Sequence, residues 1–154
     1  MLSRTVFTLL LIVICQSCLA DPLRILLTND DGYKAPGIRA MYKALIHAGH
    51  DVTIVAPATQ QSGSAASITS GGVSINEAEP GIWSVDGRPA DAVRVGIGHI
   101  MKDNPPDLVI SGANFGQNVG YDTNVSGTVG AAITALQLGF RAIAISVEVK
   151  FTDS

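Results

Sequence analysis

Three polar clusters contain the residue types best suited to chemistry in this 154-residue chain. Residues 29–32 read Asn-Asp-Asp-Gly and directly follow a short apolar run, residues 61–63 read Gln-Ser-Gly, and residues 112–122 are rich in glycine and asparagine. Ligands of open parallel α/β sheets bind at the carboxyl ends of the strands, near a switch in strand order. We therefore expect these clusters, which are far apart in the sequence, to meet at one edge of a sheet.

The adjacent carboxylates of Asp30 and Asp31 predict a cation site. Two like charges within a few ångströms repel each other and raise one pKa unless a cation neutralises them. A hard divalent ion prefers oxygen ligands, and the hydroxyl of Ser62 and the amide oxygen of Asn114 complete a set of four oxygen donors. The set favours Mg²⁺ or Mn²⁺, with Ca²⁺ as a third candidate, over zinc, because it contains no thiol or imidazole. The alternative is a plain turn, since Asp-Gly is a strong turn dipeptide.

A second candidate site is the tripeptide Ser126, Gly127 and Thr128 at the start of an expected helix. Free backbone N–H groups, the positive end of the helix dipole and two hydroxyls make such a start suitable for an anion. An ordinary helix N-cap is the alternative interpretation. The glycine-rich loop at 112–120 is also open to two interpretations, because glycines allow close approach to a phosphate but many only turn the chain. It matches neither the P-loop nor the dinucleotide fingerprint.

The elements that must position these clusters follow an α/β pattern. An apolar run at 23–28 predicts a buried strand, the apolar spacing after Pro36 predicts a helix that ends at Gly49, and 52–55 predicts a second strand. Beyond a loop or exposed hairpin at 58–74, the pattern predicts a strand at 82–85, a helix at 89–99, a strand at 108–110, a helix at 126–138 and a strand at 142–147. The fold class is therefore α/β, three-layer and Rossmann-like, with a mainly parallel sheet and helices on both faces.

Composition and charge exclude two classes of protein. A formal net charge of -3 argues against a nucleic-acid polymer as partner, since such partners are bound mainly through positive charge. With 47% hydrophobic and 15% charged residues, the chain is too apolar to be disordered.

Residues 1–20 are typical of a secretory signal peptide, followed by one domain at 21–154. Arg4 gives a positive start, an apolar run of about ten residues follows, and Ala20 is a small residue at the expected cleavage site. The run is too short for a stable membrane span, which needs roughly 20 apolar residues, although an uncleaved anchor is the alternative. We expect an exported protein, periplasmic or secreted. Cleavage would remove both cysteines, Cys15 and Cys18, and with them any disulfide or thiolate zinc site.

Seven sequence blocks resemble the SurE (survival protein E) family of 5′/3′-nucleotidases and acid phosphatases. The blocks are 25–32, 35–38, 55–57, 61–63, 85–91, 111–120 and 126–132. They occur in the family's order and extend over nearly all of the expected mature chain. One block alone would be weak evidence, whereas seven in order are specific.

The resemblance implies a divalent-metal phosphomonoesterase that hydrolyses nucleoside 5′- and 3′-monophosphates. The family's metal ligands correspond to the four oxygen donors named above: Asp30, Asp31, Ser62 and Asn114. Its phosphate site corresponds to Asn118, Ser126, Gly127 and Thr128. Family members continue beyond the end of this chain, with late strands and an arm used in homodimer or tetramer assembly. We therefore expect the C-terminal part of the domain to be missing here.

Asp30 and Asp31 are also the expected catalytic residues. Water activated by the metal is favoured over a covalent aspartyl phosphate, because Asn-Asp-Asp-Gly lacks the Asp-x-Asp pattern of aspartyl-phosphate phosphatases. The competing function is a secreted nucleotide- or anion-binding Rossmann-like module without turnover.

Overall fold

A six-stranded sheet organises the computed structural model, which describes residues 21–149. The predicted signal peptide at 1–20 lies outside the described residues. The strand order is β3-β4-β2-β1-β5-β6, and every neighbouring pair is parallel except β3 with β4. The strands are β1 (Arg24–Thr28), β2 (Asp51–Pro57), β3 (Ile75–Glu79), β4 (Ile82–Val85), β5 (Leu108–Phe115) and β6 (Ala142–Val147).

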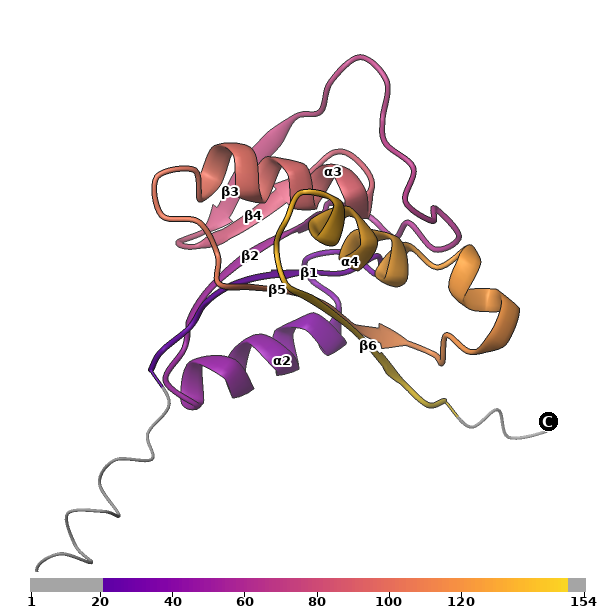
Figure 1. Ribbon diagram of the computed structural model, residues 1–154, viewed down its shortest axis with the longest axis horizontal. Coiled ribbons are helices and arrows are strands. Elements are labelled where there is room, and N and C mark those ends of the chain that lie inside the picture. Colours follow the sequence, from indigo (N-terminus) through magenta and orange to yellow (C-terminus); the bar gives the residue numbers. More distant parts are fainter. Residues whose placement is uncertain (1–20, 150–154) are drawn as a thin grey trace, which may run out of the picture.

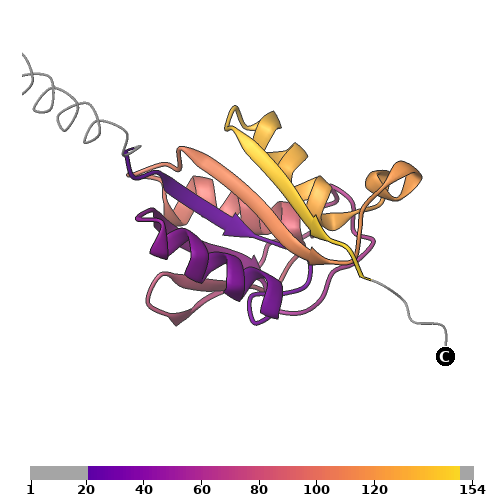
Figure 2. The same cartoon turned by 90° about the horizontal axis from the view of Figure 1, so that it is seen from below.

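Helices cover both faces of this sheet (Figure 1). One face holds α2 (Pro36–His47), which packs against β1, β2 and β5. The other face holds α3 (Pro89–Val95), continued by the π-helical turn η2 (Gly96–Ile100), and α4 (Gly127–Gln137). Figure 2 shows α2 and α4 on opposite sides of the strands. This arrangement confirms the predicted three-layer α/β class with a mainly parallel sheet.

Burial on both faces explains the sequence of the central strand. In β1, Ile25 and Leu27 pack toward α2, whereas Leu26 packs toward α3 and α4. All three are at most 1% exposed, so β1 reads as a continuous apolar run instead of an alternating one. None of the described helices is long and apolar enough to cross a membrane.

The strand order reverses at β1. From β1 the chain passes through α2 to β2 on one side, and after α3 it returns to β5 on the other side of β1. The carboxyl ends of β1, β5 and β6 point in the same direction (Figure 2). Folds of this type bind ligands in the crevice outside such a switch point, which is where residues 29–32 lie.

Two features of the sheet differ from the prediction. β3 has no counterpart in it, because four of the five residues of β3 are exposed at the sheet edge and show no apolar alternation. β5 continues to Phe115, so residues 112–115, predicted as the start of a loop, belong to a strand. The prediction of a loop over 112–120 is therefore wrong in its first half. The loop begins at Gly116 and leads into the 3-10 turn η3 (Gly120–Asn124).

Candidate active site

A turn directly after β1 presents the two adjacent carboxylates. The buried side chain of Asn29 holds this turn, because its amide donates to the carbonyl oxygen of Gly32 and its Oδ1 accepts from the Gly32 N–H, both at 3.1 Å. Gly32 has a φ of 100°, in the left-handed region that favours glycine. The turn and metal interpretations of residues 29–32 are thus compatible, since the turn fixes the positions of Asp30 and Asp31.

Asp30 points toward the start of α4. Its side chain is 3% exposed, and its Oδ1 accepts a hydrogen bond of 2.6 Å from the hydroxyl of Thr128. A Cβ on Gly127 would lie 2.7 Å from the Cβ of Asp30, so only glycine lets α4 begin this close to the carboxylate. The positive end of the α4 dipole also favours a negative charge at this position.

Asp31 contacts the end of β5. Its Oδ2 accepts from the backbone N–H of Phe115 at 3.0 Å. Burial raises the pKa of Asp31 above its ordinary value of 3.8, and the charge of Asp30 adds to the rise, whereas the Phe115 N–H opposes it. Ionised Asp31 is therefore a costly group that a neighbouring cation would stabilise.

Hydrogen bonds join the three polar clusters, as the position of the strand ends predicts. The N–H of Gln61 donates to the carbonyl oxygen of Asp30 at 2.7 Å, and Phe115 bonds Asp31. Ser62 is exposed, and its hydroxyl accepts from the side-chain amide of Gln60 at 3.2 Å. Asp31 and Gln60 line one cavity of about 670 Å³, so the loop with Ser62 adjoins the carboxylates.

Asn114 reaches the same cavity from β5. The pairing of β5 with β6 shifts register between Ser111 and Asn114, and irregularities of this kind re-aim a side chain. The side-chain Nδ2 of Asn114 donates to the carbonyl oxygen of Gly116 at 2.7 Å. The Oδ1 of the same amide takes no part in this hydrogen bond. The structure thus places Asp31 and Asn114 on a shared surface.

The residues predicted to contact phosphate have other partners in this structure. Ser126 is the N-cap of α4, because its Oγ accepts from the Val129 N–H at 3.2 Å. Thr128 is fully buried and donates to Asp30, while Asn118 donates to the hydroxyl of Ser146 at 2.8 Å. The N-cap interpretation holds for Ser126, and phosphate binding by these residues stays a prediction.

The donor atoms are of the chemical type that a hard divalent ion prefers. Within residues 21–149, the hydrogen bonds leave Oδ2 of Asp30, Oδ1 of Asp31 and Oδ1 of Asn114 without a partner. Neither ion pair of this described part includes Asp30 or Asp31. It also contains no group of three or more His, Cys, Asp or Glu residues placed to hold a metal. A cation here would depend on the mixed set of carboxylate, amide and hydroxyl oxygens.

The sequence does not predict two features beside Asp30. The first is the hydrogen bond that the hydroxyl of Thr128 donates to the carboxylate of Asp30. The second is the hydroxyl of Ser64, which is buried and has no hydrogen-bond partner among the described residues. A Cβ on Gly127 would lie 2.7 Å from this Oγ, as it would from the Cβ of Asp30. No sequence signal separates Ser64 from the other serines of the 58–74 segment, because a loop has no periodicity that assigns a direction to its side chains.

Comparisons with known proteins give consistent matches. A family described as "Survival protein SurE" matches residues 25–154. The chain is 48% identical over 128 residues to a Treponema pallidum protein named 5′-nucleotidase SurE, which covers 81% of this chain and 68% of that protein. It is 52% identical over 132 residues to a Methanopyrus kandleri protein of the same name, with coverages of 83% and 50%.

A solved structure shows the same likeness in three dimensions. The crystal structure of the SurE protein from Aquifex aeolicus aligns with a TM-score of 0.78 at 40% identity. The alignment covers 82% of this chain and 52% of that one. The chain therefore spans 68% of the Treponema pallidum protein and about half of each of the other two.

Proposed function

The chain belongs to the SurE family, and from this premise we propose that it is a divalent-metal-dependent phosphomonoesterase acting on nucleoside 5′- and 3′-monophosphates. One observation carries the proposal. Two adjacent carboxylates lie at the switch point of the sheet, outside both ion pairs of the described residues, and burial raises the pKa of one of them. Such a pair has the charge and the position of a cation site at the ligand-binding edge of the fold.

Asp30, Asp31, Ser62 and Asn114 are the residues that would hold the ion. When bound, a divalent ion neutralises phosphate charge and lowers the pKa of water, which makes water a nucleophile near neutral pH. Thr128 holds Asp30 in one orientation, which suits a ligand. Asp31 lines the cavity that a substrate would enter, and its role in the proposal is to hold the ion beside that cavity.

The remaining residues of the proposal would bind the phosphate. The side chain of Asn118, the hydroxyl of Ser126 and the backbone N–H groups of Gly127 and Thr128 would donate hydrogen bonds to its oxygens. We extend the proposal to export, on the basis of residues 1–20, and to the family's self-association as a homodimer or tetramer. Sequencing of the mature N-terminus tests export, and light scattering tests self-association.

Phosphate release tests the proposed function. AMP, 3′-AMP and p-nitrophenyl phosphate are incubated with the full chain, with EDTA, and with EDTA followed by excess Mn²⁺ or Mg²⁺. We expect release that EDTA abolishes and metal restores. Turnover that survives chelation would contradict the metal proposal, and AMP binding without turnover would instead support the nucleotide-binding module.

A further inference from the structure

The hydroxyl of Ser64 is buried beside Asp30 and has no part in the chemistry proposed above. Solvent scarcely reaches its Oγ, and no hydrogen bond joins this atom to any of the described residues. A buried hydroxyl without a partner lowers the stability of a fold, so a native protein rarely keeps one without a use for it. The groups around Ser64 indicate what that use is.

The Ser64 hydroxyl and the Asp30 carboxylate flank the same glycine. A Cβ on Gly127 would lie 2.7 Å from Oγ of Ser64 and 3.0 Å from Oδ2 of Asp30, so both oxygens lie on the side of Gly127 where a side chain would be. Oδ2 is the oxygen that Thr128 leaves free, because the Thr128 hydroxyl donates to Oδ1. A donor without an acceptor therefore lies beside an acceptor without a donor.

The loop that contains Ser64 is held against the first turn of α4. The N–H of Ala65 donates to the carbonyl oxygen of Val125 at 3.0 Å. A Cβ on Gly130 would lie 2.0 Å from the carbonyl oxygen of Ala65. Gly127 and Gly130 are three residues apart and share one face of the helix, so their missing side chains let the loop lie directly on α4.

The main chain also ties Ser64 to Asp30. The N–H of Ser64 donates to the carbonyl oxygen of Gln61 at 3.2 Å, and the N–H of Gln61 donates to that of Asp30 at 2.7 Å. Ala65 has a φ of 50°, which a residue with a side chain rarely adopts and keeps only where its surroundings fix it. The contacts of the main chain on both sides of Ser64 thus determine where its hydroxyl lies.

We propose that Ser64 is a positioning residue of the cation site, whose hydroxyl donates a hydrogen bond to Oδ2 of Asp30 when the ion is bound. Thr128 and Ser64 then hold the two oxygens of one carboxylate, and Oδ2 keeps a lone pair for the ion. Because solvent scarcely reaches Oγ of Ser64, a substrate that enters from solvent does not touch it. The inference rests on the proposed function and adds a residue to the same site.

Replacing Ser64 with alanine removes this hydroxyl and nothing else. We expect Ser64→Ala to raise the Kd for Mn²⁺ about 10-fold, the loss typical of a group that supports a metal ligand, measured by calorimetric titration of the full chain. In EDTA, the Tm of Ser64→Ala should equal or exceed that of the wild-type chain, because the change deletes a buried hydroxyl that no described residue satisfies. A lower Tm in EDTA together with unchanged Mn²⁺ affinity would assign the hydroxyl to the fold alone and overturn the inference.

Ser70→Ala is the matched control. Ser70 belongs to the same 58–74 segment but is exposed, so its removal should leave the Kd for Mn²⁺ within about 2-fold of the wild-type value. An equal loss of affinity in both variants would trace the effect to the segment as a whole and overturn the role of Ser64.

Combination with Thr128→Val tests whether Ser64 acts through Asp30. Two hydroxyls that hold one carboxylate are coupled, since the second contributes less once the first is lost. In the Thr128→Val background we expect Ser64→Ala to raise the Kd for Mn²⁺ only about 3-fold, instead of about 10-fold. Losses that multiply in full would show two independent roles and would contradict a hydrogen bond from Ser64 to Asp30.

Metal titration keeps the inference separate from the proposed function, because it requires no turnover. If the wild-type chain binds Mn²⁺ more tightly than Ser64→Ala but releases no phosphate from AMP, the proposed function fails and the role of Ser64 stands. If the chain releases phosphate in a metal-dependent way and the two proteins bind Mn²⁺ equally, the role of Ser64 is refuted in an active enzyme.

Discussion

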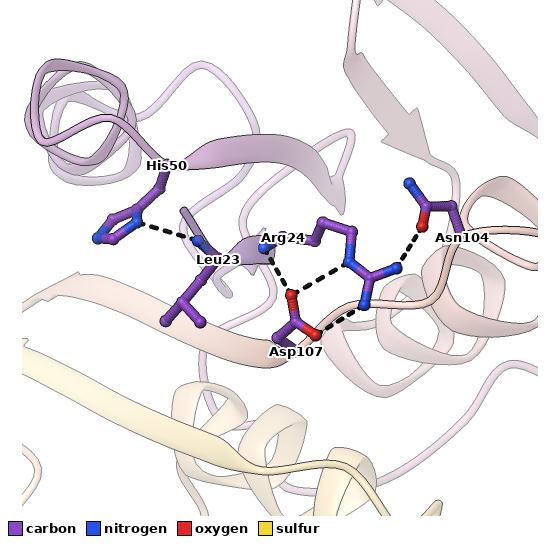
Figure 3. Close-up of polar contacts among 5 residues, drawn as sticks. All are labelled: Leu23, Arg24, His50, Asn104 and Asp107. Atoms are coloured by element: carbon purple, nitrogen blue, oxygen red, sulfur yellow. Dashed lines mark hydrogen bonds and ion pairs between the residues drawn. The ribbon is translucent and has the colours of Figure 1, made fainter. Parts of the chain in front are cut away.

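The two ends of the same strands hold their carboxylates in opposite ways. At the amino ends of β1 and β5, Asp107 accepts from Nη2 of Arg24 at 2.7 Å, from its Nε at 3.1 Å and from its backbone N–H at 2.9 Å (Figure 3). Nearby, His50 accepts from the Leu23 N–H, a structural contact at the exposed edge. At the carboxyl ends, Asp30 and Asp31 are bound only by a hydroxyl and a backbone N–H.

This difference is visible in the pKa values. The hydrogen bonds from Arg24 lower the pKa of Asp107 to about 2, whereas burial and the neighbouring Asp30 raise the pKa of Asp31. The chain neutralises its acid at the amino end with its own cation. At the carboxyl end it gathers oxygen donors and supplies no cation from the described residues. The unmatched charge therefore indicates which end of the sheet takes a ligand.

The strongest test of this contrast removes one carboxylate from each end. Asp30→Asn should reduce phosphate release from AMP by roughly 100-fold or more, because it removes a proposed ligand of the ion. A bound ion supplies several kcal/mol of charge stabilisation in the transition state. Asp107→Asn is the matched substitution at the amino end and should leave kcat/KM within about 2-fold. Circular dichroism of both variants checks that each is folded. Equal losses in the two variants would mean that the ends do not differ in function.

Metal binding should stabilise the fold only when the carboxylates at the carboxyl ends of the strands are intact. At 100 times its Kd, a bound ion adds about 2.7 kcal/mol to the free energy of unfolding. We expect Mn²⁺ to raise the Tm of the wild-type chain and of Asp107→Asn, and to leave Asp30→Asn nearly unchanged. Differential scanning calorimetry in EDTA and in Mn²⁺ measures this. A Tm rise of equal size in Asp30→Asn would place the ion elsewhere.

Thr128→Val is expected to have a smaller effect than loss of the ligand. The hydroxyl of Thr128 orients Asp30 without contacting the ion, and removal of such supporting groups typically costs about 10-fold in metal affinity or activity. Thr128→Ser keeps the hydroxyl and should restore Mn²⁺ affinity, measured by calorimetric titration. If Thr128 serves only the fold, both variants will keep wild-type affinity after correction for Tm.

Much of the fold follows from the sequence, because buried parallel strands and amphipathic helices have strong patterns. β1, α2 and β2 coincide with their predicted segments to within about two residues. β3 could not be found this way, since an exposed edge strand buries no face that would impose a pattern. The extension of β5 through Gly112 was also hidden, because glycine usually signals a turn.

For the site, the sequence predicts which groups gather but not how they are held. Because parallel strands place their carboxyl ends at one edge of the sheet, the sequence predicts that the clusters of Asp30 and Asn114 meet there. This prediction needs no knowledge of side-chain directions. The hydrogen bond between Asp30 and Thr128 joins residues 98 positions apart, and no local rule specifies it. The same holds for Asp31 and Phe115, whose contact depends on where β5 ends.

The smallest expected effect is the opposite pH response of the two ends in metal-free protein. Asp107 has a folded pKa of about 2, below its ordinary 3.8, so its pairing with Arg24 stabilises the fold above pH 3.8 and is lost as pH falls through about 2. The pKa of Asp31 is raised, so its contribution is fully present below pH 3.8 and is lost as pH rises through the folded value. Because Asp107 is at the surface, solvent screening keeps its effect small.

Urea midpoints measured in EDTA from pH 2 to pH 7 separate these two responses. Asp107→Asn should flatten the dependence of stability on pH below 3.8, whereas Asp31→Asn should flatten it above 3.8 and raise the midpoint near neutral pH. The second change gains stability because it removes a half-buried charge next to Asp30, at the expense of metal binding. A loss of neutral-pH stability in metal-free Asp31→Asn would show that the carboxyl end is already balanced without an ion, and the contrast between the two ends would fail.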